Sequence, residues 1–223
     1  MPVPLAAELH RPTVLVGECG GCWGPRLQAL GWGRMWITRR PAPYKGEPWG
    51  FDNGAFRYYL AGRPFDDAAF LQRLERAHAV GVPLLAVVPD IVAAGVRSLD
   101  FSMGWMPRLP GDWPWYLAVQ DGMTEADVLP LLGRFAGLFL GGSTAFKRSA
   151  GAWCALAHRY GRRFHYARAG TLAKLEHARE IKADSLDSAF PMWTRRRFDI
   201  FCRHWRDGDR QQRIPGLFDS AAT

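Results

Sequence analysis

Two acidic residues stand where an apolar run gives way to small and polar residues, the pattern of a strand that ends in a loop. Asp52 lies in the segment 50–56, and Asp187 lies in the segment 183–191. A carboxylate is costly to bury unless it has partners or a task. Two carboxylates are the minimum equipment for chemistry at a sugar carbon, because one attacks or stabilises that carbon while the other moves protons.

Further polar or glycine positions follow other short apolar runs. They are Asp90, Gln120, Gly141, Gly142 and Arg168, which come after the runs at residues 84–88, 115–119, 138–140 and 164–167. Runs of this kind are typical of buried strands. Segments with helical patterns alternate with them, at residues 66–80, 124–135, 150–160, 172–181 and 195–205. This alternation predicts a parallel sheet that helices cover on both faces.

The number of strand and helix units favours an α/β fold, a compact (β/α)8 TIM-like barrel in which some units can be irregular. The carboxyl ends of all barrel strands meet at one mouth, which would bring Asp52, Asp90 and Asp187 together. A doubly wound open sheet is the competing architecture, and there only residues near the switch point would meet. We expect a single catalytic domain over residues 1–223, with a basic helix at about 194–210.

Charge and composition bear on the partner and the compartment. The chain of 223 residues carries a net charge of +8, its pI is about 9.7, and arginines cluster at residues 195–197. This favours a nucleic acid as partner over a merely solvated basic face. No apolar run reaches about 18 residues and no signal peptide is evident, so a membrane span is not expected. Four cysteines make no disulfide framework at this length, and a reducing cytoplasm is expected.

The motifs resemble those of one enzyme superfamily. Residues 51–56 look like the Asp-Ser-Gly-Gly-Phe motif of the tRNA-guanine transglycosylases, and residues 184–191 are similar to their Asp-Met-Phe-Asp-Cys-Val-Met-Pro. Residues 119–122 and 140–143 resemble their Val-Gln-Gly-Gly and Gly-Gly-Leu turns. The closer resemblance is to the DpdA-type DNA deazaguanine transglycosylases, which pair a Gln-Asp-Gly turn with a Gly-Gly-Ser/Thr…Lys segment and a His-x-x-Arg strand end. All three occur here, between residues 120 and 168.

The resemblance implies an activity and a role for each motif residue. Such enzymes exchange guanine in DNA for a 7-deazaguanine base, for example 7-cyano-7-deazaguanine, and no cofactor is expected. Asp187 would be the nucleophile at C1′, and Asp52 would be the general acid/base. The residues that would bind the base are Asp90, Gln120, Gly141, Gly142 and Phe56. Their chemistry suits this task, because a carboxylate accepts from the N–H donors of a guanine edge and glycines let a backbone approach a flat base.

Basic and aromatic side chains would hold the DNA. Contacts to the nucleic acid are expected from Lys147, His165, Arg168, Arg195, Arg196 and Arg197. A base inside a duplex cannot reach a barrel mouth, so it must be flipped out or taken from a single strand, and an accessory protein could open the strands. The aromatic candidates for stacking are Phe56, Tyr58, Tyr59, Trp105 and Trp193.

Plainer interpretations of the same acidic and amide residues stay open. Asp187 can be the N-cap of a helix that follows it, and Asp90 can cap the helix after Pro89. Asp52 can belong to an ordinary Asn-Gly turn, and Gln120 to a plain strand-to-helix turn. The functional alternatives are a tRNA-guanine transglycosylase, a DNA glycosylase that admits water, and a nucleic-acid-binding protein without activity.

A structural zinc site is the remaining cofactor question. Enzymes of the superfamily that act on tRNA carry a Cys-x-Cys-x-x-Cys…His motif after the nucleophile, and this chain offers only Cys202 and His204 there. Cys19 and Cys22 could complete a four-ligand site if the barrel brings both ends of the chain together. The favoured interpretation is inert thiols and no metal. The missing motif argues against tRNA as the substrate.

Overall fold

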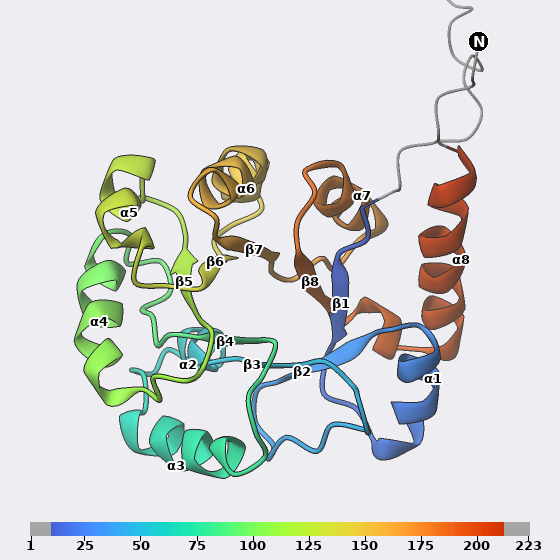
Figure 1. Cartoon of the computed structure of the whole chain (residues 1–223), viewed down its shortest axis with the longest axis horizontal. Helices are drawn as coiled ribbons and strands as arrows, with labels where there is room; N and C mark the ends of the chain where they lie inside the picture. Colours follow the sequence, from blue (N-terminus) through green and yellow to red (C-terminus); the bar gives the residue numbers. More distant parts are fainter. Residues whose placement is uncertain (1–9, 212–223) are drawn as a thin grey trace, which may run out of the picture.

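The computed structural model describes residues 10–211 and forms a closed barrel of eight parallel strands. The strands follow one another in chain order around the barrel, and Figure 1 shows helices around its outside. Their bounds are β1 Thr13–Val16, β2 Gly33–Trp36, β3 Trp49–Phe51, β4 Leu85–Val87, β5 Trp115–Val119, β6 Gly137–Leu140, β7 Arg163–Tyr166 and β8 Ser185–Ser188. The pairing of β1 with β8, with Leu15 opposite Asp187, closes the sheet. The predicted barrel is therefore confirmed, and the open sheet is excluded.

Eight α-helices connect or follow these strands in the described part of the chain. They are α1 Gly24–Ala29, α2 Ala55–Leu60, α3 Asp67–His78, α4 Arg97–Trp105, α5 Glu125–Leu132, α6 Ala150–Arg159, α7 Leu172–Glu180 and α8 Arg195–Gln211. Short 3-10 helices, η1 to η4, lie at Gly21–Trp23, Met106–Arg108, Phe146–Ser149 and Phe190–Met192. None of the described helices is long and apolar enough to cross a membrane.

Local sequence explains where several helices begin. Asp66 accepts a hydrogen bond from the backbone N–H of Ala69 and so caps α3. Thr124 and Asp127 form a reciprocal capping box at the start of α5, as their spacing predicts. Thr171 caps α7 by accepting from the Lys174 N–H. Each cap satisfies donors that the first turn of a helix cannot satisfy internally.

Apolar side chains fill most of the inside of the barrel, and polar side chains lie at its mouth. Leu15, Met35 and Tyr116 belong to the buried apolar cluster inside the barrel. Gly50 leaves room for this packing, because a Cβ at that position would lie 2.7 Å from the Met35 sulfur and 2.9 Å from a Leu15 methyl carbon. The larger apolar core lies between the strands and the surrounding helices. On β8, however, Asp187 lies opposite Leu15 of this interior.

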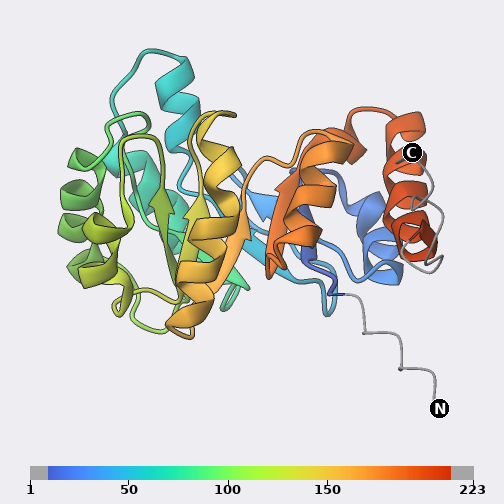
Figure 2. The same ribbon diagram turned by 90° about the horizontal axis from the view of Figure 1, so that it is seen from above.

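Helix α8 lies beside α1 on the outside of the barrel, as both views show (Figures 1 and 2). Its aromatic side chains Phe198, Phe201 and Trp205 are buried and pack with their rings near Trp32. The arginines at its start are exposed or half-buried. The basic helix expected at about 194–210 is present, with bounds Arg195–Gln211.

Candidate functional site

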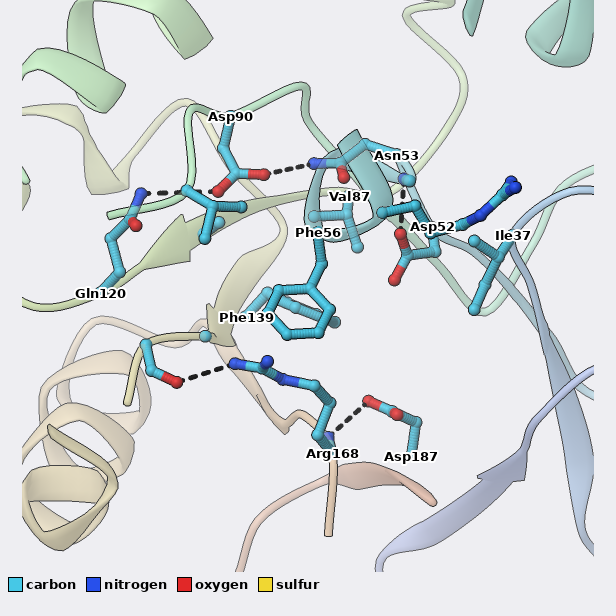
Figure 3. A pocket seen from close by; sticks show the side chains of 16 residues that line it. Ile37, Asp52, Asn53, Phe56, Val87, Asp90, Gln120, Phe139, Arg168 and Asp187 are labelled. Atoms are coloured by element: carbon cyan, nitrogen blue, oxygen red, sulfur yellow. Dashed lines mark hydrogen bonds between the residues drawn. The ribbon is translucent and has the colours of Figure 1, made fainter. Parts of the chain in front are cut away.

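A cavity of about 140 Å³ lies at the mouth of the barrel, where the carboxyl ends of the strands meet. A cavity of this size accepts an aromatic ring, since an apolar cavity of about 150 Å³ in another protein binds benzene. Among the residues that line it are the expected positions Asp52, Phe56, Asp90, Gln120, Gly141, Gly142, Arg168 and Asp187. Figure 3 shows the labelled side chains around this space. The fold therefore brings together Asp52 and Asp187, which are 135 positions apart in the chain.

Asp187 is held from one side only. Its Oδ1 accepts from the backbone N–H of Arg168 at 3.0 Å, and it lies 3.0 Å from Nε2 of His165. The other ring nitrogen of His165, Nδ1, lies 2.8 Å from the hydroxyl of Ser185. Within residues 10–211, Oδ2 of Asp187 has no hydrogen-bond partner. The carboxylate is thus fixed through one oxygen while the other is available to a ligand in the cavity.

His165 and Ser185 were not expected to support Asp187. Both side chains are buried inside the barrel, and the His165 ring stacks on Phe139 with 4.9 Å between centroids and 5° between planes. A histidine that bridges a hydroxyl and a carboxylate has its ring orientation fixed on both sides. The sequence signal was available, because positions 185 and 187 are two apart on one strand and therefore face the same side.

Asp52 follows β3 directly and lies at a tight turn. Its Oδ1 accepts from the backbone N–H of Gly54 at 2.6 Å, and Gly54 has a left-handed φ of +77°. Arg73 holds this turn from behind, because its guanidinium donates to the carbonyl oxygens of Ile37, Asp52 and Asn53. The turn that was the plainer interpretation of Asp52 is therefore present, and it aims the side chain into the cavity.

Burial is the main cause that raises the pKa of Asp52 to about 6. The negative charge of Asp187 raises the pKa further, whereas the Gly54 hydrogen bond and the charges of Arg73 and Arg168 lower it. A carboxyl group with a pKa near the working pH can both give and take a proton. Asp52 therefore combines a raised pKa with a place beside the Asp187 carboxylate, which suits it to acid/base chemistry.

Asp90 lies across the cavity in a network of amide groups. Its Oδ1 accepts from Nδ2 of Asn53 at 2.7 Å, and its Oδ2 accepts from Nε2 of Gln120 at 3.4 Å. Burial is the main cause that raises the pKa of Asp90 to about 6, against the effect of the Asn53 hydrogen bond. Each carboxylate oxygen can accept a second bond, so Asp90 keeps capacity for a ligand. It does not cap α4, whose N-cap is Val96.

Gln120 is more fully engaged than the sequence suggests. Its amide nitrogen also donates to the Ile91 carbonyl at 2.9 Å, and its Oε1 accepts from the backbone N–H of Ala93 at 2.6 Å. The side chain therefore positions Asp90 and the loop after β4, and its amide oxygen already has a donor. The backbone turn expected at Gln120 is present as well, since its carbonyl accepts from the Met123 N–H.

Gly142 is required by both backbone conformation and space. Its φ is +72°, and a Cβ there would lie 2.7 Å from Oδ2 of Asp121 and 2.8 Å from a ring carbon of Phe146. Within the described residues its N–H has no hydrogen-bond partner. The preceding Gly141 N–H bonds back to the Val119 carbonyl at 2.9 Å. Of the two glycines, only Gly142 offers the cavity a donor.

Phe56 and Arg168 lie against each other at the mouth. The Arg168 guanidinium carbon is 4.1 Å from the centroid of the Phe56 ring, and Nη2 donates to the Gly142 carbonyl at 2.7 Å. Figure 3 shows the arginine beside the Phe56 ring, on the side toward Asp187. Arg168 has a φ of +53°, unusual for a residue with a Cβ. A flat cation thus occupies a face of the aromatic ring that a planar ligand would use.

Two residues that were expected to contact nucleic acid, His165 and Lys147, are buried, which corrects that expectation. His165 is fully buried beneath Asp187, so its side chain cannot reach a phosphate. Lys147 is 4% exposed, and its ammonium donates to the carbonyl oxygens of Leu140 and Ala167. Burial, followed by the charge of Arg168, lowers the pKa of Lys147 to about 7. The sequence motif around Lys147 carries no information about how deeply its side chain is buried.

The arginines of α8 lie on the surface, outside the cavity. Arg195 and Arg196 are exposed, and Arg197 is half-buried over the rings of Trp193 and Phe190, at 4.5 and 5.4 Å from their centroids. None of the three lines the barrel-mouth cavity. Among the stacking candidates, Trp193 is 57% exposed, whereas Trp105 is buried in the core and is excluded.

The four potential zinc ligands are not assembled. Cys22 is exposed and Cys202 is buried, while His204 pairs with Glu176 at 2.7 Å. No group of three or more His, Cys, Asp or Glu side chains that could hold a metal ion occurs in the described part of the chain. Nor is Asp187 a helix cap, because it lies within β8 and the N-cap of η4 is Ala189.

Comparison with known proteins finds no family model that matches this chain, and no curated protein matches it either. The function is therefore inferred from the geometry of the cavity and from the motifs that line it.

Proposed function

We propose that this protein is a DNA guanine transglycosylase, which exchanges guanine for a 7-deazaguanine base through a covalent intermediate on Asp187. One observation carries the proposal. Asp187 of β8 and Asp52, which follows β3, line the same cavity, where Oδ2 of Asp187 has no partner among residues 10–211 and Asp52 has a pKa of about 6. These are the two roles that retaining exchange at a glycosidic carbon requires.

The first half of the reaction releases guanine. Oδ2 of Asp187 attacks C1′ of the nucleotide, forming a C–O bond, and the electron pair of the C1′–N9 bond leaves with the base. Asp52 in its protonated form donates a proton to the departing base, so guanine leaves neutral. His165 and the Arg168 N–H hold Asp187 through Oδ1, so that Oδ2 keeps its direction.

The second half restores the enzyme. The incoming 7-deazaguanine gives its N9 proton to the Asp52 carboxylate and attacks C1′, and the C–O bond to Asp187 breaks. Two inversions at C1′ give net retention, and no external energy source is needed because one glycosidic bond replaces another. An acid/base with a pKa near neutrality serves both halves.

The base would be recognised through hydrogen bonds to its edge and through stacking on the face of its ring. Asp90 accepts from the N–H donors of a guanine-like edge, and the unpaired Gly142 N–H donates to its carbonyl oxygen. The Phe56 ring is 37% exposed and offers a stacking surface at the mouth once Arg168 moves aside. DNA as the polymer is supported by the net charge of +8 and by the resemblance of residues 120–168 to the DNA-modifying branch.

Base exchange tests this proposal. The protein is incubated with DNA or with tRNA that carries labelled guanine, with and without 7-cyano-7-deazaguanine, and the released guanine is followed. We expect release of more than one guanine per enzyme from DNA only, dependent on the added base, abolished in Asp187→Asn and unchanged in the control Asp100→Asn, an exposed carboxylate on α4. Repeated release without the added base would indicate a glycosylase, release from tRNA a tRNA-directed enzyme, and no release a binding protein.

A further inference from the structure

A second cavity, which we call the basic notch, lies beside the first, between the loops that follow β6 and β7. Its volume is about 330 Å³, and it is lined by Gly142, Ser143, Thr144, Lys147, Arg168 and Lys174. Gly142 and Arg168 also line the barrel-mouth cavity, so the two spaces are neighbours. A ligand that fills one therefore lies next to a ligand in the other.

The side chains of the basic notch carry positive charge without a carboxylate among them. Three of the six lining residues are Lys147, Arg168 and Lys174. The acidic residue of the neighbouring turn, Asp121, is already engaged, because its two oxygens accept from the backbone N–H and the hydroxyl of Ser143, each at 2.6 Å. Asp121 and Asp187 lie nearby, but neither lines the notch, and cations that line a recess favour an anion.

Hydrogen-bond donors in the basic notch are only partly used. Nζ of Lys174 makes one long contact, 3.4 Å, to the hydroxyl of Thr144. The backbone N–H of Thr144 has no hydrogen-bond partner within residues 10–211. Lys147 lies deep, where two carbonyl oxygens hold its amino group and burial lowers its pKa to about 7, so Lys174 and Arg168 are the main cations of the notch. A tetrahedral oxyanion would satisfy the Lys174 ammonium and this N–H together.

We propose that the basic notch binds a backbone phosphate of the DNA, next to the nucleotide whose base occupies the barrel-mouth cavity. The inference rests on the proposed function for the identity of the neighbouring ligand. It adds that the substrate is recognised as a nucleotide within a strand, with Lys174 as the main phosphate ligand. Arg168, which lies between the two spaces, can then contact the phosphate when the base takes its place on Phe56.

The test uses a short single-stranded DNA with one guanine and a series of copies in which one linkage at a time is an uncharged methylphosphonate. Dissociation constants are measured against salt for the wild type, for Lys174→Gln and for Lys174→Arg. Arg76→Gln, on the exposed face of α3, is the matched control. We expect Lys174→Gln to weaken binding roughly tenfold and to lower the salt slope by about 0.7, whereas Lys174→Arg and Arg76→Gln keep the wild-type slope.

The methylphosphonate series locates the phosphate. A methylphosphonate at one linkage beside the guanine should weaken binding to the wild type about as much as Lys174→Gln does. The same methylphosphonate should not weaken binding to Lys174→Gln any further, because both changes remove the same contact. The proposal would be overturned if Lys174→Gln kept the wild-type salt slope, or if the losses of affinity from Lys174→Gln and from the methylphosphonate simply added. It would also be overturned if a methylphosphonate weakened binding equally at every linkage.

Failure of the basic notch and failure of the proposed function give different results. Binding of free 7-cyano-7-deazaguanine reports on the barrel-mouth cavity alone, and the exchange of labelled guanine reports on whether the chemistry occurs. If both occur and Lys174→Gln matches the wild type on DNA, the phosphate site is refuted and the transglycosylase stands. If neither occurs while Lys174 and one linkage remain coupled, the phosphate site stands and the transglycosylase is refuted.

Discussion

Replacing Asp52 by asparagine should stabilise the protein at neutral pH while it abolishes exchange. In the folded chain, burial and the charge of Asp187 raise the pKa of Asp52 to about 6 from 3.8. The folded state therefore binds more protons than the unfolded state between these two values, and stability falls as pH rises through that window. The amide introduced by Asp52→Asn carries no charge, and its oxygen can still accept from the Gly54 N–H.

The size of the effect follows from the shift. A change of roughly two pKa units corresponds to about 3 kcal/mol when the group is fully ionised in both states. Asp52 is only half-buried, so solvent reduces this figure, and we expect Asp52→Asn to gain about 1–2 kcal/mol at pH 8. As pH falls toward 3.8 and below, the carboxyl group becomes protonated in both states, and the gain should fade.

Urea unfolding between pH 3.5 and pH 8, followed by the fluorescence of the ten tryptophans, measures this difference. Asp121→Asn is a control of opposite sign. Partial burial alone would raise the pKa of Asp121, but the hydrogen bonds from Ser143 outweigh it and lower that pKa, so the carboxylate stabilises the fold. A gain for Asp52→Asn that does not change with pH, or a loss at pH 8, would refute the assignment of Asp52 as a buried acid/base.

Three further changes test the supports of the site. His165→Ala should lower kcat for exchange roughly 100-fold with KM little changed, because Asp187 loses its orientation, and His165→Gln should recover part of the rate; equal rates for all three proteins would contradict this. Phe56→Ala should weaken binding of 7-cyano-7-deazaguanine by about 1–3 kcal/mol in calorimetry, and unchanged affinity would exclude stacking. Gly142→Ala should destabilise the fold by about 1–3 kcal/mol in urea unfolding, because its φ is positive and its Cβ would meet Asp121, and wild-type stability would show that the loop adapts.

Much of the fold could be predicted from the sequence, because buried parallel strands leave continuous apolar runs. The runs before Asp90, Gln120 and Gly141 are all observed as strands, and the capping box at Thr124 is at its expected place. The helices α1, α2 and α4 were not predicted. They are short or begin without a side-chain cap, and the N-cap of α2 is a glycine with positive φ, so local signals are weak.

The residues that line the site could be predicted, but their connections could not. Strand ends must meet in a barrel, so the sequence alone predicts that Asp52, Asp90 and Asp187 lie together. The contact of Arg168 with Phe56 joins a loop to a helix 112 positions away (168 − 56 = 112), and no periodicity reports such a pair. The depth of Lys147 likewise depends on how η3 packs against β6 and β7, which is a tertiary property.

The covalent intermediate is the most direct test of the account. A short single-stranded DNA with one guanine is mixed with the wild type in the absence of an incoming base, quenched, and the intact mass of the protein and the position of any adduct are determined. We predict one base-free DNA strand attached at Asp187, present also in Asp100→Asn and absent from Asp187→Asn. Guanine release without an adduct, or an adduct that persists in Asp187→Asn, would contradict the assignment of Asp187 as the nucleophile.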